Sequence, residues 1–372
     1  MNPDPRQAKG ERLARQFGWV RRVDETSYKV HSETRDVEYD VFSTESGWSC
    51  SCPDFTYRSL KCGHVWAVEI SWTLRQEVES GTVIRPVNAL ACPSCQSVRV
   101  VKHGIRHNDY GDIQQYLCEC GRTFVVNLGF ERMKASPQAI TQAMQLYFTG
   151  ESLRNVQRFL RLQGVNVSHV SILRWIRKYV GLMQTYLDQI TPQVSDVWRA
   201  DELFVKVKGD MKYLFALMDD ESRFWIAQQM TDGKFTADVR PLFAEAKRVA
   251  GKRPLTLITD GGMHFTKPFK REFYTNTLPR AQHVRDIRFN SPIHNNKMER
   301  MNGEVRDREK VTRGLKTVDT PILKGYKLFH NFVRPHEALN GKTPSEACGI
   351  KVEGENKWLT LIQNSSLKRP LK

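Results

Sequence analysis

Close pairs of cysteines constrain this chain more than any other feature of its sequence. Seven of the eight cysteines fall between Cys50 and Cys120, and the eighth is Cys348. The first twenty residues lack the continuous apolar segment of a secretory signal, so we expect a chain that is not exported. In that setting disulfides are rare, and clustered cysteine pairs are typical of zinc sites. The sequence therefore predicts small zinc-binding units in the first third of the chain.

The first candidate zinc site combines two cysteines one residue apart with a cysteine and a histidine one residue apart: Cys50, Cys52, Cys62 and His64. Three thiolates and an imidazole can complete a tetrahedron around Zn²⁺. Polar and apolar residues alternate over residues 19–50, which predicts short antiparallel strands leading into the first cysteine. The pattern resembles the SWIM zinc finger over roughly residues 19–75. This resemblance implies a unit that binds DNA or protein.

The second candidate zinc site is formed by four cysteines in two pairs: Cys92, Cys95, Cys118 and Cys120. Apolar alternation over residues 92–126, with a turn at Asn108 to Gly111, predicts a second small β unit. It resembles the zinc ribbon that precedes many transposases, although its second pair has one intervening residue where the usual knuckle has two. We expect one structural Zn²⁺ in each of the two units.

The charge of the chain favours a polyanionic partner. Its 57 Lys and Arg against 41 Asp and Glu give a net charge of +16 and a pI near 9.5. The proportions of hydrophobic (40%) and charged (26%) residues are those of a globular protein. The chain therefore has enough apolar residues to form a core, and disorder caused by too few of them is excluded. Nucleic acid is the first partner to expect, and an anionic membrane surface the second. No stretch approaches 18 uncharged apolar residues, so we expect no membrane-spanning helix.

Residues 138–180 show the periodicity of helices and predict a helix-turn-helix. Gly164 falls in the connection, and Ser168 is the expected N-cap of the second helix. On that helix Leu173 and Ile176 can pack inward, which leaves three basic side chains to contact DNA: His169, Arg174 and Arg177. A plain helical hairpin in a core explains the pattern nearly as well, and only the basic context favours DNA binding.

Three acidic residues lie on separate predicted elements: Asp201 in a strand-like run, Asp260 at the end of the buried strand LTLITD, and Glu299 at the start of a helix. Carboxylates arranged in this way are what a two-metal site needs. At about 100° per residue, Arg306 shares the helix face of Glu299, whereas Glu304 points about 140° away. Helix geometry therefore selects Glu299, with Arg306 two turns along to meet a phosphate.

The stretches that carry these residues resemble the DDE transposases of prokaryotic insertion sequences: WRADELFVKVKGDMKYLFALMDD, LITDGG, NNKMERMNGEVRDREKVTRGLK and NFVRPHEALNGKTPSEACGI. That family has a ribonuclease H-like core related to retroviral integrases. The resemblance implies a catalytic triad of Asp201, Asp260 and Glu299, a basic partner at Arg306, and two bound Mg²⁺ or Mn²⁺ ions. It implies a DNA transposase that binds the ends of its element, cleaves there and joins the strands to target DNA. Paired ends need paired active sites, so we expect at least a homodimer on double-stranded DNA.

The expected architecture is a multidomain chain of mixed α+β and α/β class. Its predicted parts are a SWIM-type unit over 1–88, a zinc ribbon over 89–130, a helix-turn-helix over 131–190, a ribonuclease H-like core with a mixed sheet flanked by helices over 191–350, and a basic tail over 351–372. Two alternatives stay open: a domesticated DNA-binding regulator that does not cut, which the three carboxylates disfavour, and a nuclease of the same fold. We expect a cytoplasmic, nucleoid-associated protein without membrane association.

Overall fold

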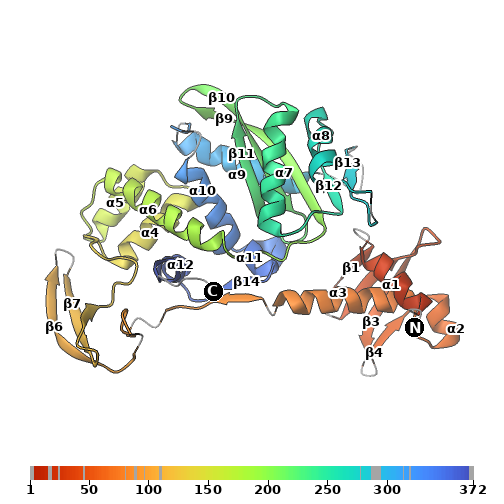
Figure 1. Cartoon of the computed structure of the whole chain (residues 1–372), viewed down its shortest axis with the longest axis horizontal. Helices are drawn as coiled ribbons and strands as arrows, with labels where there is room; N and C mark the ends of the chain where they lie inside the picture. Colours follow the sequence, from red (N-terminus) through yellow and green to blue (C-terminus); the bar gives the residue numbers. More distant parts are fainter. Residues whose placement is uncertain are drawn as a thin grey trace. The chain divides into compact units, whose positions relative to one another are not determined.

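The computed structural model describes residues 4–15, 19–23, 26–44, 47–79, 81–87, 90–95, 97–108, 111–276, 278–285, 295–312, 314–317 and 320–367. The chain divides into two compact units, Met1–Gly81 and Thr82–Lys372, and Figure 1 labels most of their elements. The division falls earlier than the predicted boundary at residue 88. The reason is that β5 (Thr82–Ile84) pairs in parallel with β14 (Ile350–Val352), which ties residues 82–84 to the second unit.

The first unit is a four-stranded antiparallel sheet with three described helices. The strands pair in sequence order: β1 (Val20–Arg22), β2 (Ser27–His31), β3 (Glu38–Thr44) and β4 (Gly47–Cys50). The helices are α1 (Pro5–Arg15), α2 (Pro53–Arg58) and α3 (Gly63–Glu79). Helix α1 packs closely on α3, because a Cβ at Gly10 would lie 2.3 Å from the Cβ of Trp66. The small β unit predicted from residues 19–50 is confirmed.

The second unit begins with the four-cysteine segment. Its described strands form a three-stranded antiparallel sheet: β6 (Val100–Asn108), β7 (Gly111–Cys118) and β8 (Thr123–Val125). Asn108 pairs with Gly111, so β6 and β7 meet at the predicted turn. Tyr116 stacks on Phe124 with ring centroids 5.9 Å apart, which joins β7 to β8. The second predicted β unit is confirmed.

Three helices follow, as the periodicity of residues 138–180 predicts: α4 (Pro137–Thr149), α5 (Leu153–Leu162) and α6 (His169–Leu187). Each begins at a serine, Ser136, Ser152 or Ser168, whose side chain accepts a hydrogen bond from the backbone N–H three residues later. Such caps satisfy one of the unpaired N–H groups at a helix start. The predicted N-cap at Ser168 is therefore confirmed.

The core of the second unit is a mixed sheet with the strand order β11-β10-β9-β12-β13 (Figure 1). Its strands are β9 (Val197–Val207), β10 (Asp210–Asp219), β11 (Trp225–Thr231), β12 (Thr256–Ile258) and β13 (Gln282–Val284). The first three along the chain are antiparallel, β12 pairs in parallel with β9, and β13 pairs in parallel with β12. Helices α7 (Thr236–Ala250), α8 (Met263–Glu272) and α9 (Asn296–Thr312) flank the sheet. The expected mixed sheet flanked by helices is confirmed.

The C-terminal segment is part of this core. It contains α10 (Pro321–Leu328), a π-helical turn (Phe329–Val333), a 3-10 turn (Glu337–Leu339), α11 (Pro344–Ala347), β14 and α12 (Lys357–Ser366). Trp358 is 2% exposed and stacks on Phe148 and Phe329, and Leu361 is fully buried. The prediction of a basic tail over 351–372 is therefore wrong for residues 351–366. These apolar residues at helical spacing cover α4 and α6, and residues 368–372 lie outside the described part.

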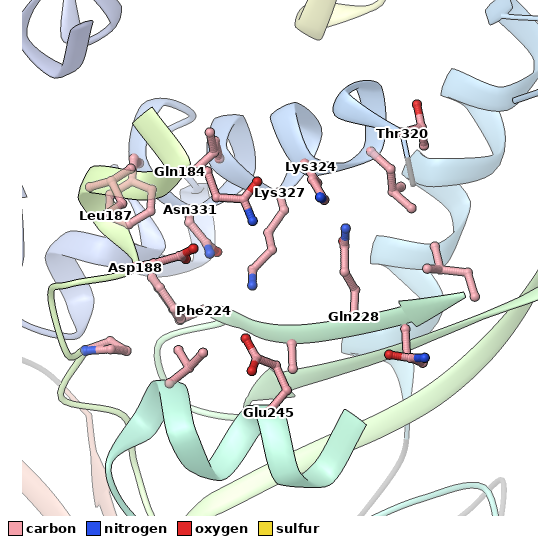
Figure 2. A pocket seen from close by; sticks show the side chains of 18 of the residues that line it. Gln184, Leu187, Asp188, Phe224, Gln228, Glu245, Thr320, Lys324, Lys327 and Asn331 are labelled. Carbon is pink, nitrogen blue, oxygen red and sulfur yellow. The ribbon is translucent and has the colours of Figure 1, made fainter. Parts of the chain in front are cut away.

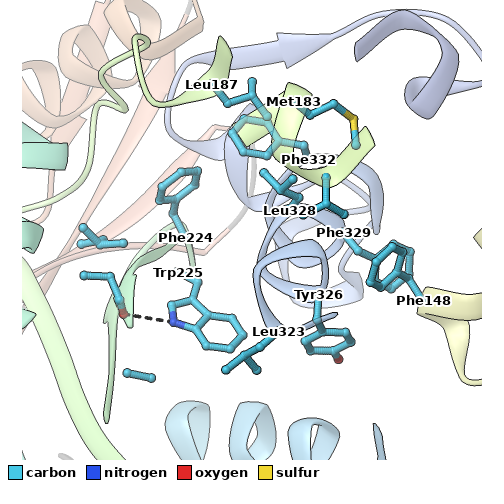
Figure 3. Close-up of a cluster of buried hydrophobic side chains, with 14 of the residues drawn as sticks. Phe148, Met183, Leu187, Phe224, Trp225, Leu323, Tyr326, Leu328, Phe329 and Phe332 are labelled. Atoms are coloured by element: carbon cyan, nitrogen blue, oxygen red, sulfur yellow. Dashed lines mark hydrogen bonds between the residues drawn. The ribbon is translucent and has the colours of Figure 1, made fainter. Parts of the chain in front are cut away.

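An apolar cluster joins α10 and the π-helical turn to the edge of the sheet (Figure 3). Phe224 meets Phe332 edge to face, and Trp225 meets Tyr326 in the same way. Asn331 occupies the place of a further strand, because its Nδ2 donates to Trp225 O at 3.0 Å and its Oδ1 accepts from Trp225 N at 2.8 Å. The edge of β11 is thereby covered at Trp225, where an open edge would expose unpaired backbone groups.

None of the described helices is long and apolar enough to span a bilayer.

Candidate functional site

The sheet brings Asp201 and Asp260 together. Asp201 lies in the middle of β9, and β12 runs beside it in parallel with Ile258 opposite Arg199. Asp201 comes two residues after Arg199, and Asp260 comes two residues after Ile258. Because the two segments run in parallel, this equal spacing brings the two aspartates side by side. Oxygen atoms of Asp201, Glu202 and Asp260 lie within 4.8 Å of one another. The parallel pairing of β9 and β12 therefore creates a cluster of carboxylates.

Helix α9 adds the third predicted residue and an amide. The helix packs on β9, and Glu299 lies exposed in its first turn. One turn later, Nδ2 of the buried Asn302 donates to Oδ2 of Asp201 at 2.9 Å. Residues three apart on a helix share a face, so Glu299 projects on the side that meets Asp201. Glu299 is not one of the residues whose oxygens lie within 4.8 Å of one another. Its negative charge nevertheless contributes to raising the pKa of Asp201.

The electrostatics of the cluster favour a cation. Burial, the charge of Asp260 and then the charges of Glu202 and Glu299 raise the pKa of Asp201 to about 7. The Gly262 N–H donates to Oδ1 of Asp260 at 3.0 Å, which holds the second carboxylate at the start of α8. Carboxylate oxygens crowded in this way repel one another, and they are the ligands that Mg²⁺ and Mn²⁺ prefer. The donor set therefore fits the expected divalent ions.

Two other residues on α9 were weighed from the sequence. Glu304 contacts the C-terminal segment, since its Oε2 accepts a hydrogen bond from Tyr326 Oη at 3.0 Å and pairs with Arg334 Nη1 at 2.6 Å. Because Glu304 bonds to the C-terminal segment, this contact agrees with the prediction from helix geometry that Glu299, not Glu304, belongs to the acidic triad. Arg306 is exposed two turns after Glu299, where it stays a prediction for phosphate contact.

Sequence reasoning missed the residues that hold the site in place. Buried Arg199 and Asp220 form an ion pair, and Lys297 Nζ donates to Asp220 O at 2.8 Å and to its Oδ1 at 2.9 Å. This network links β9 and the end of β10 to the first turn of α9. No sequence motif predicts this network or the contact between Asn302 and Asp201, because the partners lie far apart in the sequence. Only the helix face shared with Glu299 could have suggested Asn302.

Both sets of predicted zinc ligands come together. The three cysteines and the histidine of the first unit, and the four cysteines of the second, each place ligand atoms within 4.8 Å of one another. Sγ of Cys50 and Sγ of Cys62 lie 3.9 Å from His64 Nδ1, and Cys92–Cys120 and Cys95–Cys118 have sulfur separations of 3.8 and 3.5 Å. Zn–S bonds of about 2.3 Å at tetrahedral angles place sulfurs about 3.8 Å apart. All eight cysteines are described as free thiols, so both clusters fit zinc.

Helix α6 has a buried face and a basic exposed face. Ile176 is buried and Leu173 is half-buried, as expected, while Arg174 and Arg177 are exposed and His169 is half-exposed near the start of the helix. The same helix packs on α10 and α12. Helix α6 therefore packs in the core, as the helical-hairpin alternative expects, and still exposes a basic face, as a helix-turn-helix requires. DNA contact by the three basic residues stays a prediction.

A cavity of about 300 Å³ lies between α6, α7, α10 and β11, and none of the three predicted carboxylates is among the described residues that line it (Figure 2). Lys327, Asp188 and Glu245 approach one another across it. Lys327 Nζ donates to Ile226 O at 2.7 Å, and burial lowers the pKa of this lysine to about 8. The cavity is separate from the carboxylate cluster.

Comparison with known proteins gives two family matches. The family described as a DDE domain matches residues 195–336, a range that contains Asp201, Asp260 and Glu299, and the SWIM zinc finger family matches residues 39–72. The transposase for the insertion sequence-like element IS431mec of Staphylococcus aureus is 28% identical over 135 residues, covering 35% of this chain and 58% of the relative. An uncharacterized protein in transposable element ISH50 of Halobacterium salinarum is 29% identical over 175 residues, covering 46% and 53%. The chain thus spans somewhat more than half the length of these curated relatives.

Solved structures with some likeness include the HTLV-2 integrase catalytic core domain in complex with magnesium, with 19% identity over 42% of this chain and 97% of that chain and a TM-score of 0.32. The simian T-cell lymphotropic virus intasome in complex with PP2A regulatory subunit B56 gamma has 15% identity over 55% and 72%, with a TM-score of 0.32. The family matches fall on the carboxylate-bearing sheet and on the first zinc unit. The chain therefore contains a region similar to the DDE domain family over residues 195–336 and a region similar to the SWIM zinc finger family over residues 39–72.

Proposed function

We propose that this chain is a DNA transposase that binds the ends of its element, cleaves the DNA there and joins the resulting 3′-hydroxyls to target DNA. The meeting of Asp201 on β9 with Asp260, which comes two residues after the parallel strand β12, carries the proposal. The contact of Asn302 with Asp201 supports it, because it joins the helix of Glu299 to the same cluster. The DDE match and the transposase relatives support it as well.

Asp201, Asp260 and Glu299 would hold two divalent cations. When bound, Mg²⁺ or Mn²⁺ supplies activation of a water or 3′-hydroxyl nucleophile and stabilisation of the leaving 3′-oxygen. The chain's own groups prepare the ligands: Asn302 orients the Asp201 carboxylate, and the Gly262 N–H orients that of Asp260. No covalent protein intermediate is needed, so one set of carboxylates serves both cleavage and joining.

DNA binding is assigned to α6, with help from the zinc units. Arg174 and Arg177 present exposed guanidinium groups, and His169 lies near the helix start, where a recognition helix contacts base edges. Arg306 is assigned to a phosphate near the carboxylates. The net charge of +16 supports a polyanionic partner. Because two ends must be joined, the active species on double-stranded DNA is at least a homodimer, which would work in the cytoplasm at the nucleoid.

Strand joining tests the catalytic assignment. The purified full chain is incubated with Mg²⁺ and a DNA fragment that carries the gene's own flanks, beside Asp260→Asn and the control Asp210→Asn. Asp210 is an exposed residue at the start of β10, so this control makes the same change away from the cluster. We expect the wild type and Asp210→Asn to cleave and join, and Asp260→Asn to bind only. Full activity of Asp260→Asn would contradict the assignment.

The same assay separates the two alternatives. Binding without cleavage by every variant would favour a DNA-binding regulator, and cleavage without joining would favour a nuclease of the same fold. Recognition is tested by gel shift on the element's end with Arg174→Ala. The control is Arg248→Ala, which removes an equal charge that is already paired with Glu245. We expect weaker binding for Arg174→Ala alone, and equal affinities would contradict the assignment of α6.

A further inference from the structure

Two buried polar atoms face each other beside the carboxylate cluster without a hydrogen bond between them. Oε2 of Glu202 lies 3.4 Å from Nε2 of His264, and the two side chains are 12% and 10% exposed. Neither atom has a hydrogen-bond partner among the described residues. A buried polar atom left without a partner costs free energy, so this pair requires an explanation.

The positions of both residues tie them to the candidate active site. Glu202 follows Asp201 on β9, and one of its oxygens belongs to the cluster with Asp201 and Asp260. His264 lies in the first turn of α8, four residues after Asp260. The pair thus adjoins the aspartates.

The imidazole is fixed in place by its surroundings. Its ring folds over Gly262, where a Cβ would lie only 2.5 Å from the ring Cε1. The rings of Phe215 and Phe265 lie 5.6 and 4.3 Å from it, measured between centroids. A ring held between these groups keeps Nε2 directed at Glu202, so the 3.4 Å separation is a property of the packing.

This separation is the one expected for two ligands of one cation. Metal bonds of about 2.1 Å to nitrogen and oxygen place two ligand atoms about 3.0 Å apart at octahedral angles and about 3.4 Å apart at tetrahedral angles. The nearby cation of the chain does not take this role, because Lys234 Nζ lies 4.0 Å from the other oxygen of Glu202. A metal ion between Oε2 and Nε2 would satisfy both buried atoms.

We propose that Glu202 and His264 form a metal-binding site that adjoins the Asp201–Asp260 pair, with Glu202 shared between the two. The imidazole makes this site favour a transition ion such as Mn²⁺ over Mg²⁺, since Mg²⁺ is a hard cation that takes oxygen ligands. This inference deepens the proposed function. It rests on one part of that function, the binding of cations at Asp201 and Asp260. The competing explanation is a buried ion pair between a protonated His264 and Glu202.

The test measures Mn²⁺ binding to the full chain with its cysteine sites already loaded with Zn²⁺. Electron paramagnetic resonance counts the bound Mn²⁺, and pulsed measurements detect coupling of that ion to a ¹⁴N nucleus, which only a nitrogen ligand produces. The variants are His264→Gln and Glu202→Gln, with His283→Gln as the matched control. His283 is a half-buried histidine on β13, and its Nε2 contacts Thr259 Oγ1 at 3.0 Å.

We expect ¹⁴N coupling in the wild type and in His283→Gln, its loss in His264→Gln, and Mn²⁺ affinity at least about tenfold weaker in His264→Gln and Glu202→Gln. Competition with Mg²⁺ should show that the preference for Mn²⁺ falls with His264→Gln. Bound Mn²⁺ without ¹⁴N coupling in the wild type would overturn the proposal and favour the ion pair. That result needs no variant, so it holds even if a substitution disturbs folding.

The outcome is separable from that of the proposed function. If Asp260→Asn abolishes DNA joining while wild-type Mn²⁺ shows no ¹⁴N coupling, the transposase assignment stands and the Glu202–His264 site is refuted. If ¹⁴N coupling is present but no variant joins or cleaves DNA, the metal site stands and the proposed function fails.

Discussion

Lys297 ties the first turn of α9 to the end of β10, and its replacement by methionine should loosen the helix that carries Glu299. The ammonium group donates to both the backbone oxygen and the carboxylate of Asp220, and it is 28% exposed. Asp220 is 1% exposed and is paired with the equally buried Arg199. Methionine keeps the apolar length of the side chain, so the substitution removes the charge and the two hydrogen bonds.

The magnitude follows from these contacts. A hydrogen bond to a charged group contributes about 1.5–3 kcal/mol when buried, and the partial exposure of Lys297 reduces the loss to about 1–2 kcal/mol. This corresponds to roughly 5–30-fold more frequent opening of the first turn of α9. Asp220→Asn should cost more, about 3–5 kcal/mol, because it removes one charge of a buried ion pair.

Amide hydrogen exchange of peptides from α9, followed by mass spectrometry, measures the opening directly. The control is Lys310→Met on the same helix, because Lys310 is 78% exposed and pairs only with the exposed Asp307 in the described part. We expect faster exchange and slower DNA joining for Lys297→Met, with both unchanged for Lys310→Met. Exchange in the first turn that matches the wild type would refute the anchoring role of Lys297.

Three further perturbations test other parts of the structure. Metal analysis should find about two zinc ions per chain, and Cys62→Ser should lose one of them while the circular dichroism of the remaining helices persists; no zinc in the wild type would contradict both sites. Gly325→Ala places a Cβ 2.3 Å from Phe148 Cζ and should destabilise the chain by about 1–3 kcal/mol in urea unfolding. Gly181→Ala, where a Cβ meets no atom within 4 Å, should stabilise it by about 0.5–1 kcal/mol; equal effects would contradict the packing of α10. Burial lowers the pKa of Lys327 to about 8, so the unfolded state binds more protons between pH 8 and about 10.4, and stability from this group rises over that range. The unfolding free energy of the wild type relative to that of Lys327→Met should therefore rise by up to about 3 kcal/mol over this range, and a relative stability that falls with pH would contradict the burial of this lysine.

The sequence predicted the parts of the site whose signals are local. Zinc ligands come in close pairs such as Cys50 and Cys52, so spacing alone identified them. Asp260 follows a short apolar run that reads as a buried strand, and its approach to Asp201 follows once β12 pairs in parallel with β9. The helix face of Glu299 was derived from helix periodicity, and Glu304 is engaged elsewhere.

Contacts between distant segments could not be read in this way. The bond from Asn302 to Asp201 and that from Lys297 to Asp220 depend on how α9 packs on the sheet. Strand alternation places Glu202 on the face opposite Asp201, so the sequence carries no signal for its approach to Asp260. The basic tail was misjudged for a different reason: Trp358 and its apolar neighbours carried a helical signal that the charged end of the chain obscured.

The most direct test of the account is cleavage and joining of a DNA fragment with the gene's own flanks by the full chain and by Glu299→Gln, both with Mg²⁺. Glu299 is the predicted ligand that projects from α9, and glutamine preserves its size while removing its charge. The account predicts that both proteins bind the fragment and that only the wild type cleaves and joins it. Equal joining by the two proteins would contradict the role of Glu299, and binding without cleavage by both would contradict the transposase.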